Sequence, residues 1–213
     1  MEVAGRPLIA WSVEAFAAAH GVGAAVIAAP PGHESQVEEA VTGGGLKLAV
    51  VAGGATRAES VSSALAAVES ELVAVHDAAR PLVTRELIEA VLARLDARPD
   101  AAGVIAAAPL TDTVKRASEP RPAAERPERP PTVAATESRD HLWAAQTPQA
   151  FRTAALREAH TDARRAAAAT DDAMLVEQAG GVVLIEPAPA RNLKVTTPDD
   201  RRLAELLLAE RRT

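Results

Sequence analysis

Short apolar runs alternate with amphipathic helical stretches along this chain of 213 residues, and the alternation limits the folds open to it. Ala24–Ala28, Leu46–Val51 and Leu72–Val75 are mainly apolar, as strands that are buried on both faces tend to be. The stretches between them carry apolar residues at helical spacing, for example Val61 and Leu65. Parallel sheets covered by helices on both faces have this pattern, so we predict a doubly wound α/β sheet.

The expected elements follow one another closely enough to form a single domain over residues 1–213. Thr56 and Thr84 are suited to cap helices, and Glu59 follows Thr56 at the spacing of a capping box. We expect helices over Leu8–Ala19, through Val37 and Ala40, after Thr56, from Thr84 to Leu95, from Arg152, over Asp171–Gln178 and from Pro198. Further strands are expected at Gly103–Ala107, Val182–Ile185 and Asn192–Val195.

The alternating pattern breaks between Pro109 and Pro148. Thr111–Ala117 and Thr132–Thr136 have the pattern of strands, and the segment between them is rich in Pro, Arg and Glu, which rules out a core helix or a central strand. We therefore predict a β-arm over residues 110–147 that is inserted in the domain and protrudes from it. A disordered insertion is the alternative.

Composition limits the partners and the chemistry. The formal net charge is −6, and the chain has only two Trp, two Phe and no Tyr, which argues against binding to nucleic acid. The absence of cysteine excludes disulfides, zinc thiolates and thiol nucleophiles. No apolar run approaches the roughly 18 residues that span a bilayer, and the first residues do not look like a secretory leader. We expect a soluble, cytoplasmic protein with no membrane partner.

The segment Val73–Pro81 joins an apolar strand to a carboxylate and a guanidinium. Asp77 and Arg80 come just after the apolar residues that end at Val75. Ligands of open α/β sheets bind in the crevice beyond the carboxyl ends of the strands, so these two side chains are candidates for a binding site. The alternative is local: Asp77 caps the next segment and Arg80 is a solvated charge.

Further candidates lie in other loops. Gly53 and Gly54 stand between a strand and a helix, where backbone N–H groups are free to meet a phosphate or a carbonyl, and Ser60 in the first turns of the helix adds a hydroxyl; a plain turn is the alternative. Lys194 is one of only three lysines and is either a phosphate contact or an edge-strand lysine. Thr113 either contacts a ligand or belongs to the solvated side of an arm strand.

In the order in which they occur, the motifs resemble those of the 2-C-methyl-D-erythritol 4-phosphate cytidylyltransferase family. They are the glycine turn with Arg-x-x-Ser, His-Asp-Ala-Ala-Arg-Pro, Asp-Thr-Val-Lys, Gln-Thr-Pro-Gln-x-Phe, Thr-Asp-Asp and Asn-Leu-Lys-Val-Thr. The resemblance runs from Val3 to near the C-terminus. It implies a Rossmann-like nucleotidyltransferase that transfers CMP from CTP to the phosphate of methylerythritol phosphate, with Mg²⁺, and releases pyrophosphate in non-mevalonate isoprenoid synthesis. It also implies a homodimer in which the arm, from Thr113 to Thr147, completes the neighbour's site.

The resemblance implies site residues as well. Gly53, Gly54 and Ser60 match the turn that reads the cytosine and the nearby ribose, and Asp77 and Ala78 match positions that contact the nucleotide ribose and the site near the metal. The matches to methylerythritol phosphate contacts are Asp77, Arg80, Thr113, Arg139, Thr147 and Thr170. Arg139 and Lys194 match the catalytic residues that hold the attacking phosphate, and Lys194 also matches a contact near the α-phosphate of CTP. The metal ligands stay unassigned.

One departure from the family pattern concerns the first residues. Met1–Leu8 matches the part of the family that follows a glycine-rich loop with an Arg and a Pro-Lys pair. We expect from this that the domain is N-terminally incomplete, through a misassigned start or a truncation, that its first strand is missing and that its activity is impaired. The alternatives are a ribitol 5-phosphate cytidylyltransferase, which shares the fold, and a non-catalytic dimer that binds a polyol phosphate.

Overall fold

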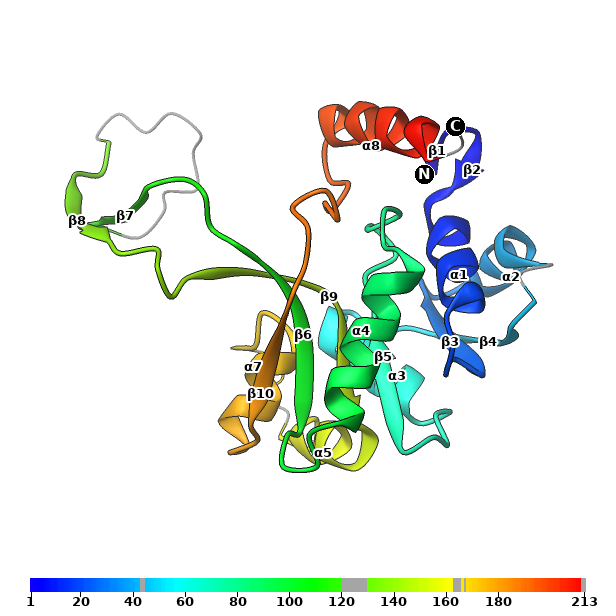
Figure 1. Ribbon diagram of the computed structural model, residues 1–213. Coiled ribbons are helices and arrows are strands. Elements are labelled where there is room, and N and C mark those ends of the chain that lie inside the picture. Colours follow the sequence, from blue (N-terminus) through cyan, green and yellow to red (C-terminus); the bar gives the residue numbers. More distant parts are fainter. Residues whose placement is uncertain (43–44, 120–129, 163–165, 167, 212–213) are drawn as a thin grey trace.

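Four strands form the main sheet of the computed structural model, which describes residues 1–42, 45–119, 130–162, 166 and 168–211 (Figure 1). Their order is β10 (Val183–Pro187), β6 (Gly103–Pro109), β9 (Trp143–Arg152) and β5 (Leu72–Val75). β10 is parallel to β6, whereas β9 is antiparallel to both of its neighbours. The α/β class is confirmed, but the prediction of a parallel sheet is wrong at β9.

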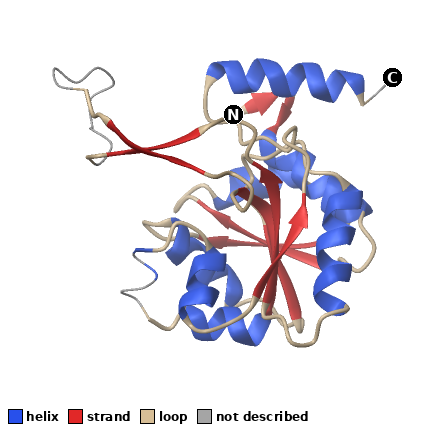
Figure 2. Ribbon diagram, turned by 60° about the vertical axis from the view of Figure 1, so that its left-hand side comes forward, coloured by secondary structure: helices blue, strands red, loops and turns tan. Residues whose placement is uncertain are grey.

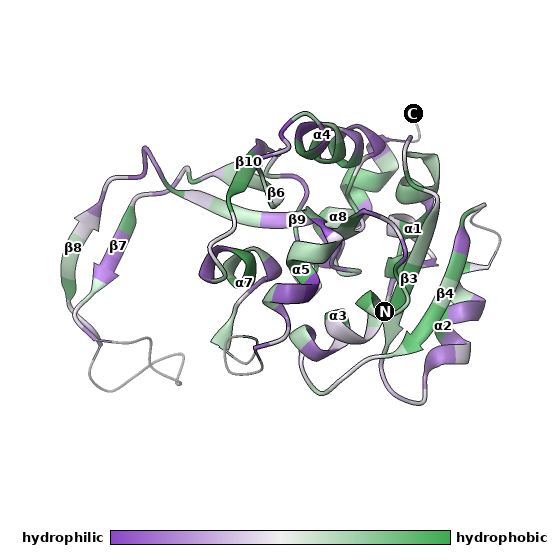
Figure 3. Ribbon diagram, turned by 90° about the horizontal axis from the view of Figure 1, so that it is seen from below, coloured by the Kyte–Doolittle hydropathy of each residue, from purple (hydrophilic) through white to green (hydrophobic). Residues whose placement is uncertain are grey.

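β3 (Ala24–Ala29) and β4 (Lys47–Ala52) form a separate parallel pair. Within the described residues no strand ladder joins this pair to β5, so the single sheet that we expected is divided into two pieces. Figure 3 shows that β3 is mostly hydrophobic, whereas the neighbouring α2 (Glu34–Val41) is largely hydrophilic. Most residues of the pair are partly exposed or exposed, and Ala29 is the one strand residue here that is buried.

Neighbouring residues of β6 face different layers of helices. Val104 packs in an apolar cluster with α4 (Arg85–Asp96). Ile105, the next residue, packs in another cluster with α5 (Thr153–Ala159) and α7 (Asp172–Gln178). Because successive side chains of a strand point to opposite faces, a run of apolar residues is what a strand covered on both sides requires. Figure 2 shows helices on both sides of the strands.

The predicted helices are confirmed with small shifts at their ends. α1 runs over Leu8–Ala18 and α3 over Arg57–Leu65. α3 begins with the predicted capping box, in which Thr56 and Glu59 each accept a hydrogen bond from the other's backbone. None of the helices in the described part of the chain is long and apolar enough to cross a membrane.

The two ends of the chain meet in a small apolar cluster. β1 (Glu2–Val3) and β2 (Arg6–Pro7) form a short antiparallel hairpin beside α8 (Pro198–Glu210). Val3 and Leu208 are buried together in this cluster. Figure 1 shows both termini at this place.

The predicted arm is present, but it is shorter than expected. β7 (Val114–Ala117) pairs with β8 (Val133–Glu137), and Figure 1 shows this ribbon projecting from the rest of the molecule. The Pro-rich tip that we predicted falls largely on residues 120–129, which lie outside the described residues. The arm boundary at residue 147 is wrong, since β9 begins at Trp143 and Thr147 is only 4% exposed within the main sheet.

The predicted strand at Asn192–Val195 is also wrong. The segment is a loop, held by a hydrogen bond from the Val195 N–H to the Ala79 carbonyl at 2.8 Å. The Asn192 side chain is buried and donates to the Gln146 amide oxygen at 2.9 Å. These bonds attach the loop to the segment after β5 and to β9, in place of a strand ladder.

Candidate functional site

Asp77 is the centre of a group of charged side chains at the carboxyl end of β5. Its Oδ2 lies 3.0 Å from Nζ of Lys194 and 3.8 Å from Nε of Arg80. Its Oδ1 lies 3.3 Å from Nε of Arg57. The structure thus brings Lys194, from a distant segment, to Asp77 and Arg80, which the sequence singled out in one segment, and adds Arg57. The Asp77 side chain is 15% exposed, so the group is accessible to a ligand.

Backbone contacts explain why these side chains converge. The Arg80 N–H donates to the Asp77 carbonyl at 2.9 Å, which closes the turn that contains Ala78. The Arg80 guanidinium donates through Nη1 to the Asn192 carbonyl at 2.8 Å. The loop that carries Lys194 is therefore fixed directly to the turn that carries Asp77.

Electrostatics favour a charged carboxylate within a cationic surround. Burial alone would raise the pKa of Asp77, but the hydrogen bond from Lys194 and the charge of Arg57 lower it below the ordinary value. Burial alone would likewise lower the pKa of Arg57, and the two carboxylates beside it raise it instead. Burial lowers the pKa of Arg80, partly offset by Asp77. Three cations thus surround one partly exposed carboxylate, which suits a polyanionic ligand.

Arg80 also has a hydrogen-bond donor to spare. In the described part of the chain its Nε is buried and has no hydrogen-bond partner. The nearest carboxylate oxygen, Oδ2 of Asp77, is at 3.8 Å, which is too long for a hydrogen bond. A buried donor without a hydrogen-bond partner is costly, and the charge of Asp77 close by offsets part of that cost.

Gly53 and Gly54 form a tight turn before α3, and Ser60 contacts this turn from the first part of the helix. The Gly54 N–H donates to Ser60 Oγ at 3.1 Å, and the Gly53 N–H donates to the Ala29 carbonyl at 2.7 Å. A Cβ at Gly54 would lie 2.3 Å from Cβ of Glu59, which is why the position requires glycine. The plain-turn alternative and the ligand-binding prediction both remain compatible with this geometry.

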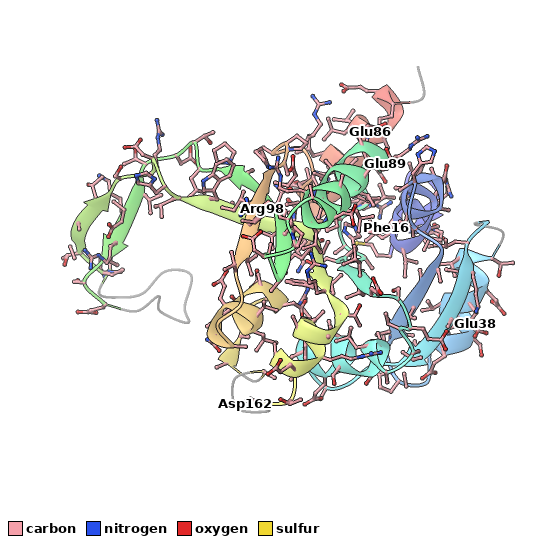
Figure 4. The ribbon with its side chains drawn as sticks, turned by 60° about the horizontal axis from the view of Figure 1, so that its bottom comes forward. Phe16, Glu38, Glu86, Glu89, Arg98 and Asp162 are labelled. Atoms are coloured by element: carbon pink, nitrogen blue, oxygen red, sulfur yellow. The ribbon has the colours of Figure 1, made fainter. Side chains whose placement is uncertain are left out.

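Thr147 lies directly behind Asp77. Its Oγ1 accepts the Asp77 N–H at 3.0 Å and lies 3.0 Å from Nδ1 of His76. The Nε2 of His76 is 3.2 Å from the Arg80 carbonyl, which can only accept, so Nε2 carries the proton and Nδ1 accepts from Thr147. Burial lowers the pKa of His76 to about 4, and its ring packs against Phe16 at a centroid distance of 5.3 Å (Phe16 is labelled in Figure 4).

Three predicted site residues contact neither this group nor the glycine turn within the described chain. Thr113 and Arg139 belong to the arm, where the Arg139 guanidinium donates to the Thr111 carbonyl. Thr170 is exposed just before α7, with its Oγ1 3.8 Å from Sδ of Met174. These residues remain predictions from the resemblance.

Arg57 and Asp172 are the charged residues that sequence reasoning did not select as site residues. Arg57 Nη1 lies 2.7 Å from Oδ2 of Asp172, whose side chain is 1% exposed. One feature of the sequence could have identified Arg57. A positive charge in the first turn of a helix is unfavourable beside the helix dipole, so an acidic partner from another segment is expected. Neither partner of Arg57 is near it in sequence.

The residues described do not form a ready metal site. They contain no group of three or more His, Cys, Asp or Glu side chains that could hold a metal ion. Both oxygens of Asp77 already face cations. The donor set therefore does not fit a metal held mainly by the protein.

An open pocket of about 340 Å³ lies apart from the Asp77 group, between α3 and α5. It is lined by Ser62, Leu65, Ala66, Arg157, His160 and Thr161. None of these was selected as a site residue, so the pocket is not the candidate site.

Comparison with known proteins agrees with the motifs. The family model described as "IspD: 2-C-methyl-D-erythritol 4-phosphate cytidylyltransferase" matches residues 1–210. The "Bifunctional enzyme IspD/IspF" of Anaeromyxobacter dehalogenans is 43% identical over 205 residues, which are 96% of this chain and 50% of that protein. The 2-C-methyl-D-erythritol 4-phosphate cytidylyltransferase of Streptomyces coelicolor is 42% identical over 217 residues, which are 98% of this chain and 76% of that protein. The chain thus spans half the length of the bifunctional relative.

Solved structures give the same result. The crystal structure of 2-C-methyl-D-erythritol 4-phosphate cytidylyltransferase from Thermus thermophilus superposes with a TM-score of 0.77 at 35% identity, covering 98% of this chain and 91% of that one. The similarity thus extends over the site as well as the fold. By its sequence and its structure, the chain belongs to the 2-C-methyl-D-erythritol 4-phosphate cytidylyltransferase family.

Proposed function

We propose that this chain transfers CMP from CTP to 2-C-methyl-D-erythritol 4-phosphate, forming 4-diphosphocytidyl-2-C-methyl-D-erythritol and pyrophosphate for isoprenoid synthesis. The observation that carries the proposal is the convergence of Lys194, Arg80 and Arg57 on Asp77 beside the glycine turn. Transfer between two polyanions requires fixed cations and N–H donors, and it requires no nucleophile from the protein.

The reaction assigns a task to each part of the site. An oxygen of the substrate phosphate attacks the α-phosphorus of CTP, a new P–O bond forms, and the bond to the bridging oxygen of pyrophosphate breaks. Gly53, Gly54 and Ser60 are assigned to the cytosine and ribose, and Asp77 to the ribose. Lys194 is 45% exposed and can exchange Asp77 for the attacking phosphate. It would orient that phosphate and stabilise the charge that develops at phosphorus.

The Arg80 guanidinium, which is held beside Asp77, supports a contact with the polyol phosphate at this point. Thr147 lies under the same turn and is fully used in holding it, as acceptor from Asp77 and donor to His76. Its contribution to binding would therefore act through the shape of the turn.

Magnesium is proposed as part of the nucleotide substrate. Mg²⁺ keeps several waters and is bound through few carboxylates together with substrate phosphates, so a site without a protein cluster is compatible with a Mg²⁺–CTP complex. The ion would neutralise phosphate charge.

We also propose that two copies of the chain assemble, with the arm of each completing the site of the other. Thr113 and Arg139 lie on a ribbon that projects away from the main sheet, which would place them beyond the Asp77 group of their own chain (Figure 1). A cytoplasmic location remains a prediction.

The direct test is pyrophosphate release from CTP, Mg²⁺ and methylerythritol phosphate, measured on this chain and on a form extended upstream of Met1. Ribitol 5-phosphate in place of methylerythritol phosphate tests the substrate. Lys194→Met should lower kcat by about 100-fold or more, because it removes a cation from the reacting phosphate. A folded protein that binds methylerythritol phosphate without releasing pyrophosphate in either form would contradict catalysis and support a binding protein.

A further inference from the structure

Arg57 links two carboxylates from different parts of the fold. Its Nε lies 3.3 Å from Oδ1 of Asp77, after β5, and its Nη1 lies 2.7 Å from Oδ2 of Asp172, at the start of α7. Arg57 itself is the first residue of α3. A guanidinium can do this because it presents several N–H donors in one rigid plane, which an ammonium does not.

Asp172 anchors one end of this link. Its side chain is 1% exposed, and its second oxygen, Oδ1, accepts a hydrogen bond from Nε2 of His160 at 3.0 Å. The His160 side chain is itself only 4% exposed. A carboxylate this deeply buried is strongly unfavourable without partners, so Arg57 and His160 are held against it.

The two cations closest to Asp77, Lys194 and Arg57, therefore differ in how easily their side chains can move. Lys194 is 45% exposed and has a flexible chain, whereas the Arg57 guanidinium is tied to a buried acid. When Lys194 moves onto a phosphate, Asp77 still needs a cation to remain charged and in place at 15% exposure. Arg57 can provide it without moving.

We propose that Arg57 is a positioning residue: anchored by Asp172 and His160, it holds the Asp77 carboxylate in place so that Lys194 can leave it for a substrate phosphate. Only the last clause rests on the proposed function. The anchoring of Asp77 is a property of the chain alone and can be measured without turnover.

A matched control arginine is available in the chain. Arg85 is the first residue of α4, follows the capping residue Thr84, and forms an ion pair with Glu89 at 2.8 Å (Glu89 is labelled in Figure 4). It thus resembles Arg57 in its position at the start of a helix, but its partners are Glu89 and His20, and it contacts no predicted site residue. Arg57→Met and Arg85→Met can be compared directly.

Arg57→Met should lower kcat by about 10- to 100-fold, as expected when a reacting group is slightly misplaced, with KM for CTP changing less than about threefold. Arg85→Met should leave kcat within about twofold of the starting protein. Arg57→Lys should recover thermal stability but not kcat, because one ammonium cannot bridge both carboxylates. Equal kcat values for Arg57→Met and Arg85→Met would overturn the proposal.

A double-mutant cycle tests whether Arg57 acts through Lys194. If it does, Arg57→Met should cost less than about threefold in kcat when Lys194 is already methionine. An additive effect of the two substitutions would mean that Arg57 acts elsewhere, for example only through stability.

Lysine labelling gives a readout that does not need activity. The chain has only three lysines, so acetylation of Lys194 can be followed by mass spectrometry with Lys47 as the internal standard. Without Arg57, Lys194 is the closest cation left on Asp77, with Arg80 farther away at 3.8 Å. Acetylation of Lys194 should therefore slow by about three- to tenfold while Lys47 is unchanged. If the starting protein released no pyrophosphate, the proposed function would fail, whereas labelling would still decide the role of Arg57. Unchanged labelling of Lys194 in Arg57→Met would refute the proposal that Arg57 holds Asp77 in place.

Discussion

At the scale of single residues, the Thr147 hydroxyl supports the whole turn that carries Asp77. It accepts the Asp77 N–H at 3.0 Å and donates to His76 Nδ1 at 3.0 Å. Thr147→Val keeps the shape but leaves both groups without a partner, so the free energy of unfolding should fall by about 1 to 3 kcal/mol. Urea denaturation would measure this loss. Thr147→Ser retains the hydroxyl and should lose less than half as much; equal losses for Ser and Val would contradict the hydrogen-bond account.

The buried His76 in the same turn should make the stability of the protein depend on pH. Burial lowers the pKa of His76 from 6.5 to about 4 in the folded protein. Between these values the unfolded chain binds a proton that the folded chain does not, so the free energy of unfolding falls as the pH drops through this window. The contribution of His76 is fully present above its unfolded pKa and should be reduced by about 2 kcal/mol at about pH 5.

The comparison that isolates this group uses His76→Asn. Urea denaturation of the starting protein and of the variant at about pH 7 and about pH 5 gives two differences in unfolding free energy. The starting protein should lose about 2 kcal/mol more than the variant over this range. Equal losses would mean that His76 is not held neutral by the fold.

At the scale of an element, the glycine turn and α3 form one unit. A Cβ at Gly54 would lie 2.7 Å from Oε2 of Glu59, the carboxylate oxygen that accepts the backbone N–H groups of Ala55 and Thr56. Gly54→Ala should therefore disturb the capping box and lower the unfolding free energy by about 1 to 3 kcal/mol. Gly23→Ala is the control, because a Cβ there meets nothing within 4 Å. A melting temperature for Gly54→Ala equal to that of Gly23→Ala would contradict this role.

Elements with a local signal could be predicted from the sequence, and those without one could not. The Thr56 capping box and the apolar run of β5 depend on neighbouring residues, and both were found. β9 was missed because its polar residues look like a loop. The buried Gln149 depends largely on remote groups: besides the Gln146 carbonyl at 3.3 Å, its Nε2 donates to Asp171 Oδ2 at 2.9 Å, and its Oε1 accepts the Ala173 N–H at 3.3 Å.

The candidate site shows the same division. Asp77 and Lys194 were found because each stands out in its own segment, and their contact confirms that they lie together. Arg57 was not selected, since its role depends on Asp172, which follows it by more than half of the chain. The spacing of residues within one segment does not show that two residues so far apart in sequence form an ion pair.

At the scale of the whole molecule, the arm raises the question of which copy completes which site. Arg139 lies on the arm and Lys194 beside the main sheet, and each contacts its own surroundings: the Thr111 carbonyl and the Asp77 carboxylate. If both residues hold the same phosphate, as the family resemblance implies, the simplest arrangement takes Arg139 from a second copy. In a two-fold dimer, each site would then contain one residue from each chain.

Mixing two inactive variants tests this arrangement. Arg139→Met and Lys194→Met should each be nearly inactive in pyrophosphate release. In a mixed dimer, one site collects both substitutions and the other collects neither, so an equal mixture exchanged to equilibrium should recover about a quarter of the starting activity. The control mixes Arg139→Met with the Arg139→Met/Lys194→Met double variant, which leaves every site without Arg139 and should recover nothing. If the first mixture is no more active than its parts while mass measurements show mixed dimers, then Arg139 and Lys194 serve the site of their own chain or do not act together.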